Sequence, residues 1–184
     1  LYTDNLGLEY FDLTRTPLET AAQLARDGSR LEPGNQLGYL ALARVHMLSN
    51  DLVQARNEVD KALSIQPESL LFIDAIGYML THLGDWDRGE ALLQKAIRLN
   101  PFYRVYTRYG LWLNAFRQGD YARALEETEW LADIGTFWSP LCRAVTLAWL
   151  GRASEASGEV EKLMAYKPEF VQRGRSLIGG ARAL

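Results

Sequence analysis

Few residues of this 184-residue chain are of types that do chemistry. It has two histidines, His46 and His82, which together with a carboxylate such as Asp74 would make an incomplete metal site, because a structural zinc ion is held by four ligands. A core histidine with satisfied hydrogen bonds is the better interpretation. We therefore expect no metal site and no cofactor.

Nucleophilic and acid–base chemistry has equally little support. The only cysteine, Cys142, stands among apolar neighbours, which predicts a buried structural thiol and not a nucleophile. Three acidic residues, Glu126, Glu127 and Glu129, are interpreted as the solvated outer face of a helix and not as a paired acid–base site. The sequence holds no phosphate-binding loop, G-x-S-x-G elbow, HExxH motif or dinucleotide fingerprint. We expect no enzymatic activity.

Charge and hydropathy exclude two classes of partner. The formal net charge of −3 is spread evenly along the chain, without the basic stretch that nucleic acids or anionic lipids require. No apolar run approaches the roughly 20 residues that cross a bilayer. We expect neither nucleic-acid binding nor membrane insertion. Because the sequence begins at Leu1 and not at a methionine, we expect a processed or excised segment of a longer chain.

The elements that would position these residues follow a repeated pattern. One block, from Gln36, has the characteristic residues Tyr39, Leu42, Ala43, His46, Asn50, Ala55, Val59, Ala62 and Pro67. The next block, from Leu70, has at the same positions Ile73, Ile76, Gly77, Leu80, Gly84, Gly89, Leu93, Ala96 and Pro101. The period is 34 residues, and its glycines and prolines predict helices over 36–48, 52–65, 70–82 and 86–98.

Weaker copies of the pattern lie on both sides. A capping box at Thr16 to Glu19 predicts a helix from Pro17 to Arg30, preceded by one over 4–13. Downstream, Gly119 and Gly151 align with Gly84. Trp112 stands at a position that is otherwise small, so we expect either a wider separation of its two helices or a partly exposed ring. A last helix over 169–178 has the mixed polarity of a terminal cap.

The period, the small residues at block positions 8 and 20 and the closing proline resemble the tetratricopeptide repeat. The resemblance implies an all-α, right-handed α-solenoid of antiparallel helix pairs with a C-terminal capping helix, which presents a binding surface instead of a catalytic pocket. One array then covers residues 1–184: a degenerate repeat over 2–33, repeats over 36–69, 70–103, 105–136 and 137–168, and a capping helix over 169–180.

In such repeats the first helix lines a concave groove. The resemblance implies a groove lined by Arg44, Asp74, Tyr78, His82, Tyr106, Tyr109, Phe116, Arg117 and Trp149. The lysine–asparagine clamp of the chaperone-tail binders is absent, since Leu40 and Arg44 occupy its positions in the first block. An aromatic groove favours an extended or helical peptide with apolar anchors. The alternative is that these rings pack against a neighbouring helix or a flanking segment of the chain.

A narrower resemblance concerns the stretch around Asn100 to Tyr103, Trp112 and Gly119 to Tyr121. It is similar to the repeats that follow effector domains in bacterial class III adenylyl cyclases and winged-helix regulators, which implies a regulatory protein-interaction module in the bacterial cytoplasm. Two other functions remain open. The chain would form a homodimer through either the aromatic groove or a cluster of Trp130, Phe137 and Trp138. It would be a small-molecule sensor if an apolar ligand bound in the groove.

Overall fold

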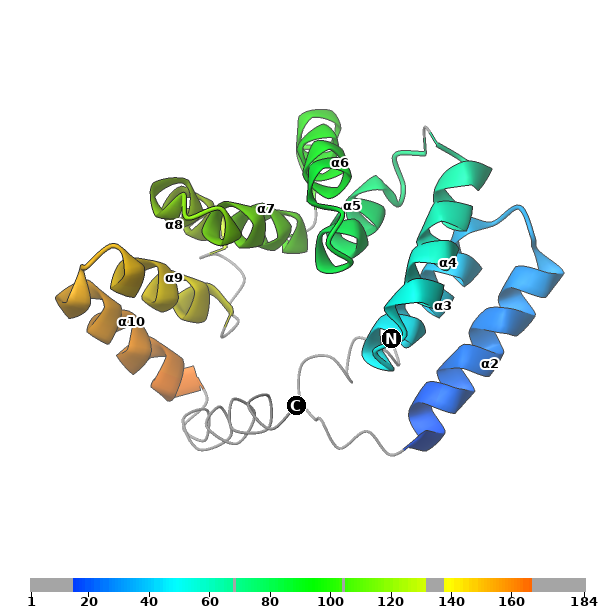
Figure 1. The fold of residues 1–184 in the computed structure, drawn as a ribbon, viewed down its shortest axis with the longest axis horizontal. Coiled ribbons are helices and arrows are strands. Elements are labelled where there is room, and N and C mark those ends of the chain that lie inside the picture. The colour runs from blue at the N-terminus through cyan, green and yellow to red at the C-terminus, as the bar shows by residue number, and fades with distance from the viewer. Residues whose placement is uncertain (1–14, 68, 104, 132–137, 167–184) are drawn as a thin grey trace. The chain divides into compact units, whose positions relative to one another are not determined.

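The computed structural model describes residues 15–67, 69–103, 105–131 and 138–166, in which all regular structure is helical (Figure 1). The helices are α2 (Arg15–Leu31), α3 (Gln36–Leu48), α4 (Leu52–Ile65), α5 (Ile73–His82), α6 (Trp86–Leu99), α7 (Tyr106–Arg117), α8 (Tyr121–Glu129), α9 (Trp138–Trp149) and α10 (Ala153–Tyr166). The helix predicted over 4–13 and the capping helix predicted over 169–178 lie outside the described residues.

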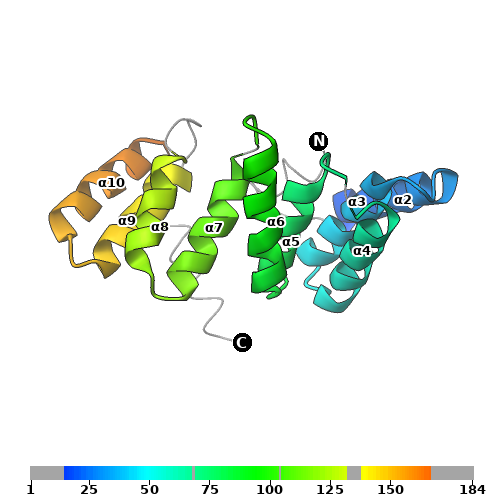
Figure 2. The same cartoon turned by 90° about the horizontal axis from the view of Figure 1, so that it is seen from above.

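The chain divides into two compact units, Leu1–Thr107 and Arg108–Leu184. In the first unit α3 packs against α2, α4 and α5, and α5 packs against α6. In the second unit α9 packs against both α8 and α10. Figure 2 shows α3 beside α4 in the first unit, and α9 beside α10 in the second.

The predicted helix bounds are confirmed for α3 and α4, and α6 is one residue longer than predicted. The prediction of a helix from residue 70 is wrong, because α5 begins only at Ile73. Its N-cap residue, Phe72, makes no side-chain capping hydrogen bond. Leu70 and Leu71 therefore lie in the loop before the helix.

Four three-residue turns have the same backbone geometry. Their central residues, Asn50, Gly84, Gly119 and Gly151, have φ values of 58°, 80°, 78° and 75°. In each turn the N–H of the next residue donates to a carbonyl five residues earlier, as from Asp85 to Leu80 at 2.9 Å. This arrangement satisfies carbonyls that the end of a helix leaves unpaired. The alignment of Gly119 and Gly151 with Gly84 is confirmed.

The core of the first unit consists of the small and apolar residues that recur in the pattern. Ala43, Ala55, Val59 and Ala62 are fully buried, and they pack with Ile76, Leu80 and their neighbours. Side chains as small as alanine at these positions let the helices approach closely. Burying this apolar surface is the main force that holds neighbouring helix pairs together.

Trp112 fills the core of the second unit. The expectation of a partly exposed ring is wrong, because only 8% of this residue is accessible. Its Nε1–H donates to Oγ1 of Thr146 on α9 at 2.9 Å, and this hydroxyl in turn donates to the carbonyl of Cys142 at 2.7 Å. A buried indole is tolerated here because its N–H has a partner.

Candidate functional site

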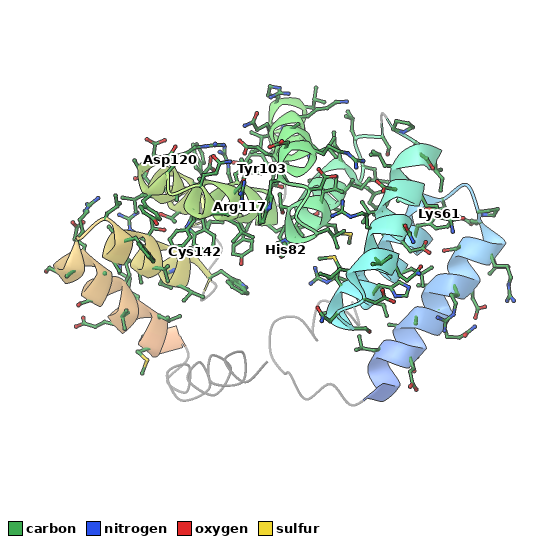
Figure 3. All side chains as sticks on the ribbon, viewed as in Figure 1. Lys61, His82, Tyr103, Arg117, Asp120 and Cys142 are labelled. Carbon is green, nitrogen blue, oxygen red and sulfur yellow. The ribbon has the colours of Figure 1, made fainter. Side chains whose placement is uncertain are left out.

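A cluster of polar and aromatic side chains is formed by α3, α5 and the start of α7, each the first helix of its repeat. The Tyr78 ring is centred 4.2 Å from the His82 ring and 5.1 Å from the Tyr106 ring. Arg44, on α3, makes a side-chain hydrogen bond with Tyr78. We call Arg44, Tyr78, His82 and Tyr106 the first-helix cluster. Figure 3 shows His82 on the edge of α5 that faces away from α6.

Burial controls the charges in the first-helix cluster. It raises the pKa of Tyr78, an effect that the charge and hydrogen bond of Arg44 oppose. It lowers the pKa of His82, in spite of the hydrogen bond between Nδ1 and the Tyr78 carbonyl at 2.9 Å. Since a carbonyl only accepts, Nδ1 carries the proton and donates. Tyr78 and His82 are therefore held neutral, and Arg44 is the cation of the cluster.

Arg44 has unused hydrogen-bonding capacity. Its Nε is buried and has no hydrogen-bond partner, and no carboxylate forms an ion pair with it within the described residues. A guanidinium presents five N–H groups and is recognised most strongly by a carboxylate.

The second unit contains a continuous row of aromatic rings. Ring centroids lie 5.3 Å apart for Trp138 and Tyr109, 5.4 Å for Tyr109 and Trp112, and 5.4 Å for Trp112 and Phe116. Phe116 also contacts Tyr121 at 5.3 Å and Trp149 at 6.3 Å. Tyr121 and Trp149 stack at 5.4 Å. We call these six residues the aromatic row; Trp149, at its end, is 63% exposed.

The predicted groove residues therefore fall into separate groups. Four of them form the first-helix cluster, and Tyr109, Phe116 and Trp149 belong to the aromatic row. Arg117 is exposed and donates to Asn114 Oδ1 at 2.9 Å. Asp74 is only 6% exposed and accepts from the Ala75 N–H at 2.7 Å, at the first turn of α5.

The structure corrects two interpretations of polar residues. Glu126 and Glu129 are exposed, as predicted, but Glu127 is not part of a solvated face, because its carboxylate lies 3.0 Å from Arg108 and its side chain is 12% exposed. Arg108 also lies over the ring of Trp130, 4.7 Å from its centroid. His46 is not a core residue: its side chain is 28% exposed, with Nδ1 3.7 Å from Asp51. Periodicity alone therefore did not indicate that Glu127 on α8 is paired with Arg108, or that His46 near the end of α3 is partly exposed.

Cys142 is a buried thiol, as predicted. It is fully inaccessible on α9, and burial raises its pKa to about 12 (Figure 3). A thiol that stays protonated at neutral pH is a poor nucleophile. Among the residues that the structure describes, no group of three or more His, Cys, Asp or Glu side chains is arranged to hold a metal ion.

Comparison with solved structures shows which fold this is. The thermophilic TPR protein TTC0263 from Thermus thermophilus matches with a TM-score of 0.71 and 18% identity, covering 100% of both chains. The fold is that of the tetratricopeptide repeat α-solenoid. MamA residues 41-end from Desulfovibrio magneticus RS-1 match with a TM-score of 0.66 and 14% identity, over 91% of this chain and 92% of that one.

A further tetratricopeptide structure, YrrB, is described as having an unusual peptide-binding site. It matches with a TM-score of 0.61 and 19% identity, over 99% of this chain and 89% of YrrB. No family model matches the sequence, and no curated protein is significantly similar to it. The likeness therefore concerns the fold.

Two cavities of the first unit were not predicted from the sequence. The Gln36 cavity, of about 380 Å³, is lined by Glu32, Asn35, Gln36, Gln66, Leu71 and Phe72 among others. The Phe102 cavity, of about 350 Å³, is lined by Leu70, Leu71, Phe72, Asp74, Leu99 and Phe102 among others. Both lie where a helix pair of the tetratricopeptide fold joins the next. The sequence signal that could have predicted these cavities is the run of large apolar residues Leu70, Leu71 and Phe72 in the loop between two repeats.

No helix within the described ranges is both long enough and apolar enough to cross a membrane.

Proposed function

We propose that this chain is a non-catalytic protein-interaction module whose first-helix cluster binds a peptide segment with an acidic residue next to an apolar anchor. The main support is Arg44, a half-buried cation with an unpartnered Nε beside the rings of Tyr78, His82 and Tyr106. A carboxylate would pair with the guanidinium, and an apolar side chain would cover the rings. The tetratricopeptide fold of the solved neighbours supports a role in recognition.

The experiment is a selection of random heptapeptides displayed on phage against the full 184-residue chain. Enriched sequences should combine Asp or Glu with a large apolar residue. Their affinity for Arg44→Gln should fall by roughly 10-fold or more, the size of a lost charged hydrogen bond of about 1.5–3 kcal/mol. Tyr78→Phe, which keeps the ring and removes only the hydroxyl, should bind with less than half of that free-energy loss.

The proposal fails if the enriched peptides bind Arg44→Gln and the parent chain equally well. It also fails if enrichment is the same on a chain with both Arg44→Gln and Tyr78→Ala, since both changes lie inside the first-helix cluster. Circular dichroism of each variant checks that the helical fold is retained.

Self-association is a second candidate function, favoured by two exposed indoles. Trp130 is 58% exposed and Trp149 is 63% exposed, both in the second unit. Large aromatic side chains on a surface are typical anchors of protein interfaces. Solution mass across a concentration series should then show a dimer that Trp149→Ser weakens. A monomer at all concentrations would leave peptide binding as the function.

We further propose a bacterial, cytoplasmic and regulatory setting, as the resemblance to repeats of adenylyl cyclases and winged-helix regulators implies. Binding of a small apolar ligand is the remaining alternative. It predicts an increase of the melting temperature in a screen of apolar metabolites, and a uniform melting temperature would count against it.

A further inference from the structure

The two cavities of the first unit are neighbours. Leu71 and Phe72, which precede α5, contribute to the wall of both. The Gln36 cavity lies between the start of α3 and the end of α4, and the Phe102 cavity lies between the start of α5 and the end of α6. The cavities are therefore equivalent places in consecutive repeats, and they share Leu71 and Phe72.

Gln36, which lines the Gln36 cavity, has a buried acceptor without a partner. Gln36 is 2% exposed, and its Nε2 donates to the carbonyls of Ala62 at 2.7 Å and Gln66 at 3.1 Å. These two bonds fix the orientation of the amide, so Oε1 is the free end. This oxygen is buried and has no hydrogen-bond partner. An unpaired buried acceptor costs about 1–3 kcal/mol, so a ligand N–H that reaches it gains correspondingly.

The same cavity carries negative charge. Glu32 is exposed at its rim, and the carboxylate accepts from the Asn35 side chain at 2.8 Å. No lysine or arginine is among the residues lining either cavity in the described part of the chain. An acceptor oxygen together with an unneutralised carboxylate selects a cationic N–H donor over an anion or a plain hydroxyl.

The Phe102 cavity supplies apolar surface. Leu70, Leu71 and Phe102 are 54%, 68% and 88% exposed, and Leu99 is 50% exposed. Exposed apolar residues grouped around a cavity mark a place where another apolar group is buried.

We propose that the two cavities form one docking surface, separate from the first-helix cluster, for a protein segment that places a lysine or arginine next to a large apolar side chain. The cation enters the Gln36 cavity, where it donates to Gln36 Oε1 and pairs with Glu32. The apolar side chain covers Leu70, Leu99 and Phe102. Leu71 lies under the backbone between them.

The test is a titration of the ¹⁵N-labelled full chain with a capped pentapeptide that has lysine between two phenylalanines, separated from each by one glycine. Two matched peptides carry glutamine in place of lysine, or alanines in place of the phenylalanines. The parent peptide should shift the amide signals of Gln36, Leu71 and Phe102, and both matched peptides should bind at least 5-fold more weakly.

Substitutions of two exposed residues locate the binding site without changing the core. Glu32→Gln should lower the affinity for the lysine peptide at least 5-fold and leave the affinity for the glutamine peptide unchanged. Phe102→Ser should lower the affinity for both of these phenylalanine-containing peptides. Matched controls are Glu19→Gln and Val53→Ser, which alter exposed residues outside both cavities. Neither control should change any affinity. Leu71→Ser replaces Phe102→Ser if the latter is poorly folded.

Four results would overturn the proposal. The first is equal affinity for the lysine and glutamine peptides, and the second is an absence of binding at millimolar peptide. The third is a set of shifted signals confined to Arg44, Tyr78 and His82, which would assign the peptide to the first-helix cluster. A concentration-dependent mass that Phe102→Ser abolishes would assign the surface to a second copy of this chain instead, and would equally end the proposal.

Discussion

Gly77 on α5 and Gly89 on α6 touch at the crossing of their two helices. A Cβ added to Gly89 would lie 3.0 Å from the Gly77 carbonyl oxygen, 2.9 Å from the Thr81 backbone N and 2.7 Å from Thr81 Cγ2. Two of these three atoms belong to the backbone, which does not move aside as a flexible side chain does. Block positions 8 and 20 are small because the backbones meet there.

Gly89→Ala should destabilise the chain by about 1–3 kcal/mol, because the added methyl group forces α5 and α6 apart. Urea unfolding followed by circular dichroism measures the effect. Gly28→Ala is the matched control, since a Cβ there has no atom within 4 Å and alanine in a helix is more stable than glycine by about 0.5–1 kcal/mol. A Gly89→Ala variant as stable as the parent would contradict this crossing.

Gly84→Ala should destabilise through its backbone alone. Gly84 has φ of +80°, and no atom lies within 4 Å of its Cβ position, so the expected loss of about 1–2 kcal/mol is the cost of a left-handed alanine. The equivalent change at Gly119 should cost the same, because φ is +78° and the surroundings are equally open. Thermal unfolding of both variants checks the prediction, and unequal costs would mean that the two turns are not equivalent.

Trp112→Phe should destabilise the second unit by about 1–3 kcal/mol, through the lost hydrogen bond and the volume left empty. The bond runs from Nε1 to Thr146 Oγ1, so Thr146→Val should remove it as well. A double-mutant cycle isolates the coupling between the two residues. Thr146→Ser keeps the hydroxyl and serves as the control. Additive losses in the cycle would show that the hydrogen bond contributes nothing.

Stability should fall as the pH decreases below about 6.5, the pKa of an unperturbed histidine, because of His82. Burial lowers the pKa of His82 in the folded chain, so the unfolded chain binds the proton at a higher pH than the folded chain does. Protons therefore favour unfolding in this window. Urea unfolding at pH 7.5 and 5.5, for the parent and His82→Gln, should show a smaller loss in the variant. Equal losses would exclude His82 as the source.

Cys142 should resist thiol reagents while the chain is folded. Its side chain is inaccessible, and its pKa of about 12 leaves almost no thiolate at pH 8. The reaction with a chromogenic disulfide should proceed only as fast as the folded chain opens around Cys142. It should become immediate in 6 M guanidinium chloride. Immediate reaction of the folded chain would show that α9 is open to solvent.

The helices and turns of this protein were predictable because they depend on neighbours in sequence. The bounds of α3 and α4 follow from capping residues and breakers, and the left-handed turn at Gly84 follows from a residue type that tolerates it. The start of α5 was not predictable from periodicity, since Leu70 and Leu71 continue the apolar pattern and yet lie in the loop before the helix.

The sequence by itself determined the repeat, the small residues at the helix crossings and the buried state of Cys142, because a period and an apolar face are local properties. The tertiary structure decided that Trp112 reaches Thr146, that Glu127 pairs with Arg108, and that Gln36 and Phe102 line neighbouring cavities. Such contacts join residues of different helices, and they depend on the direction in which each side chain leaves its helix once the helices have packed.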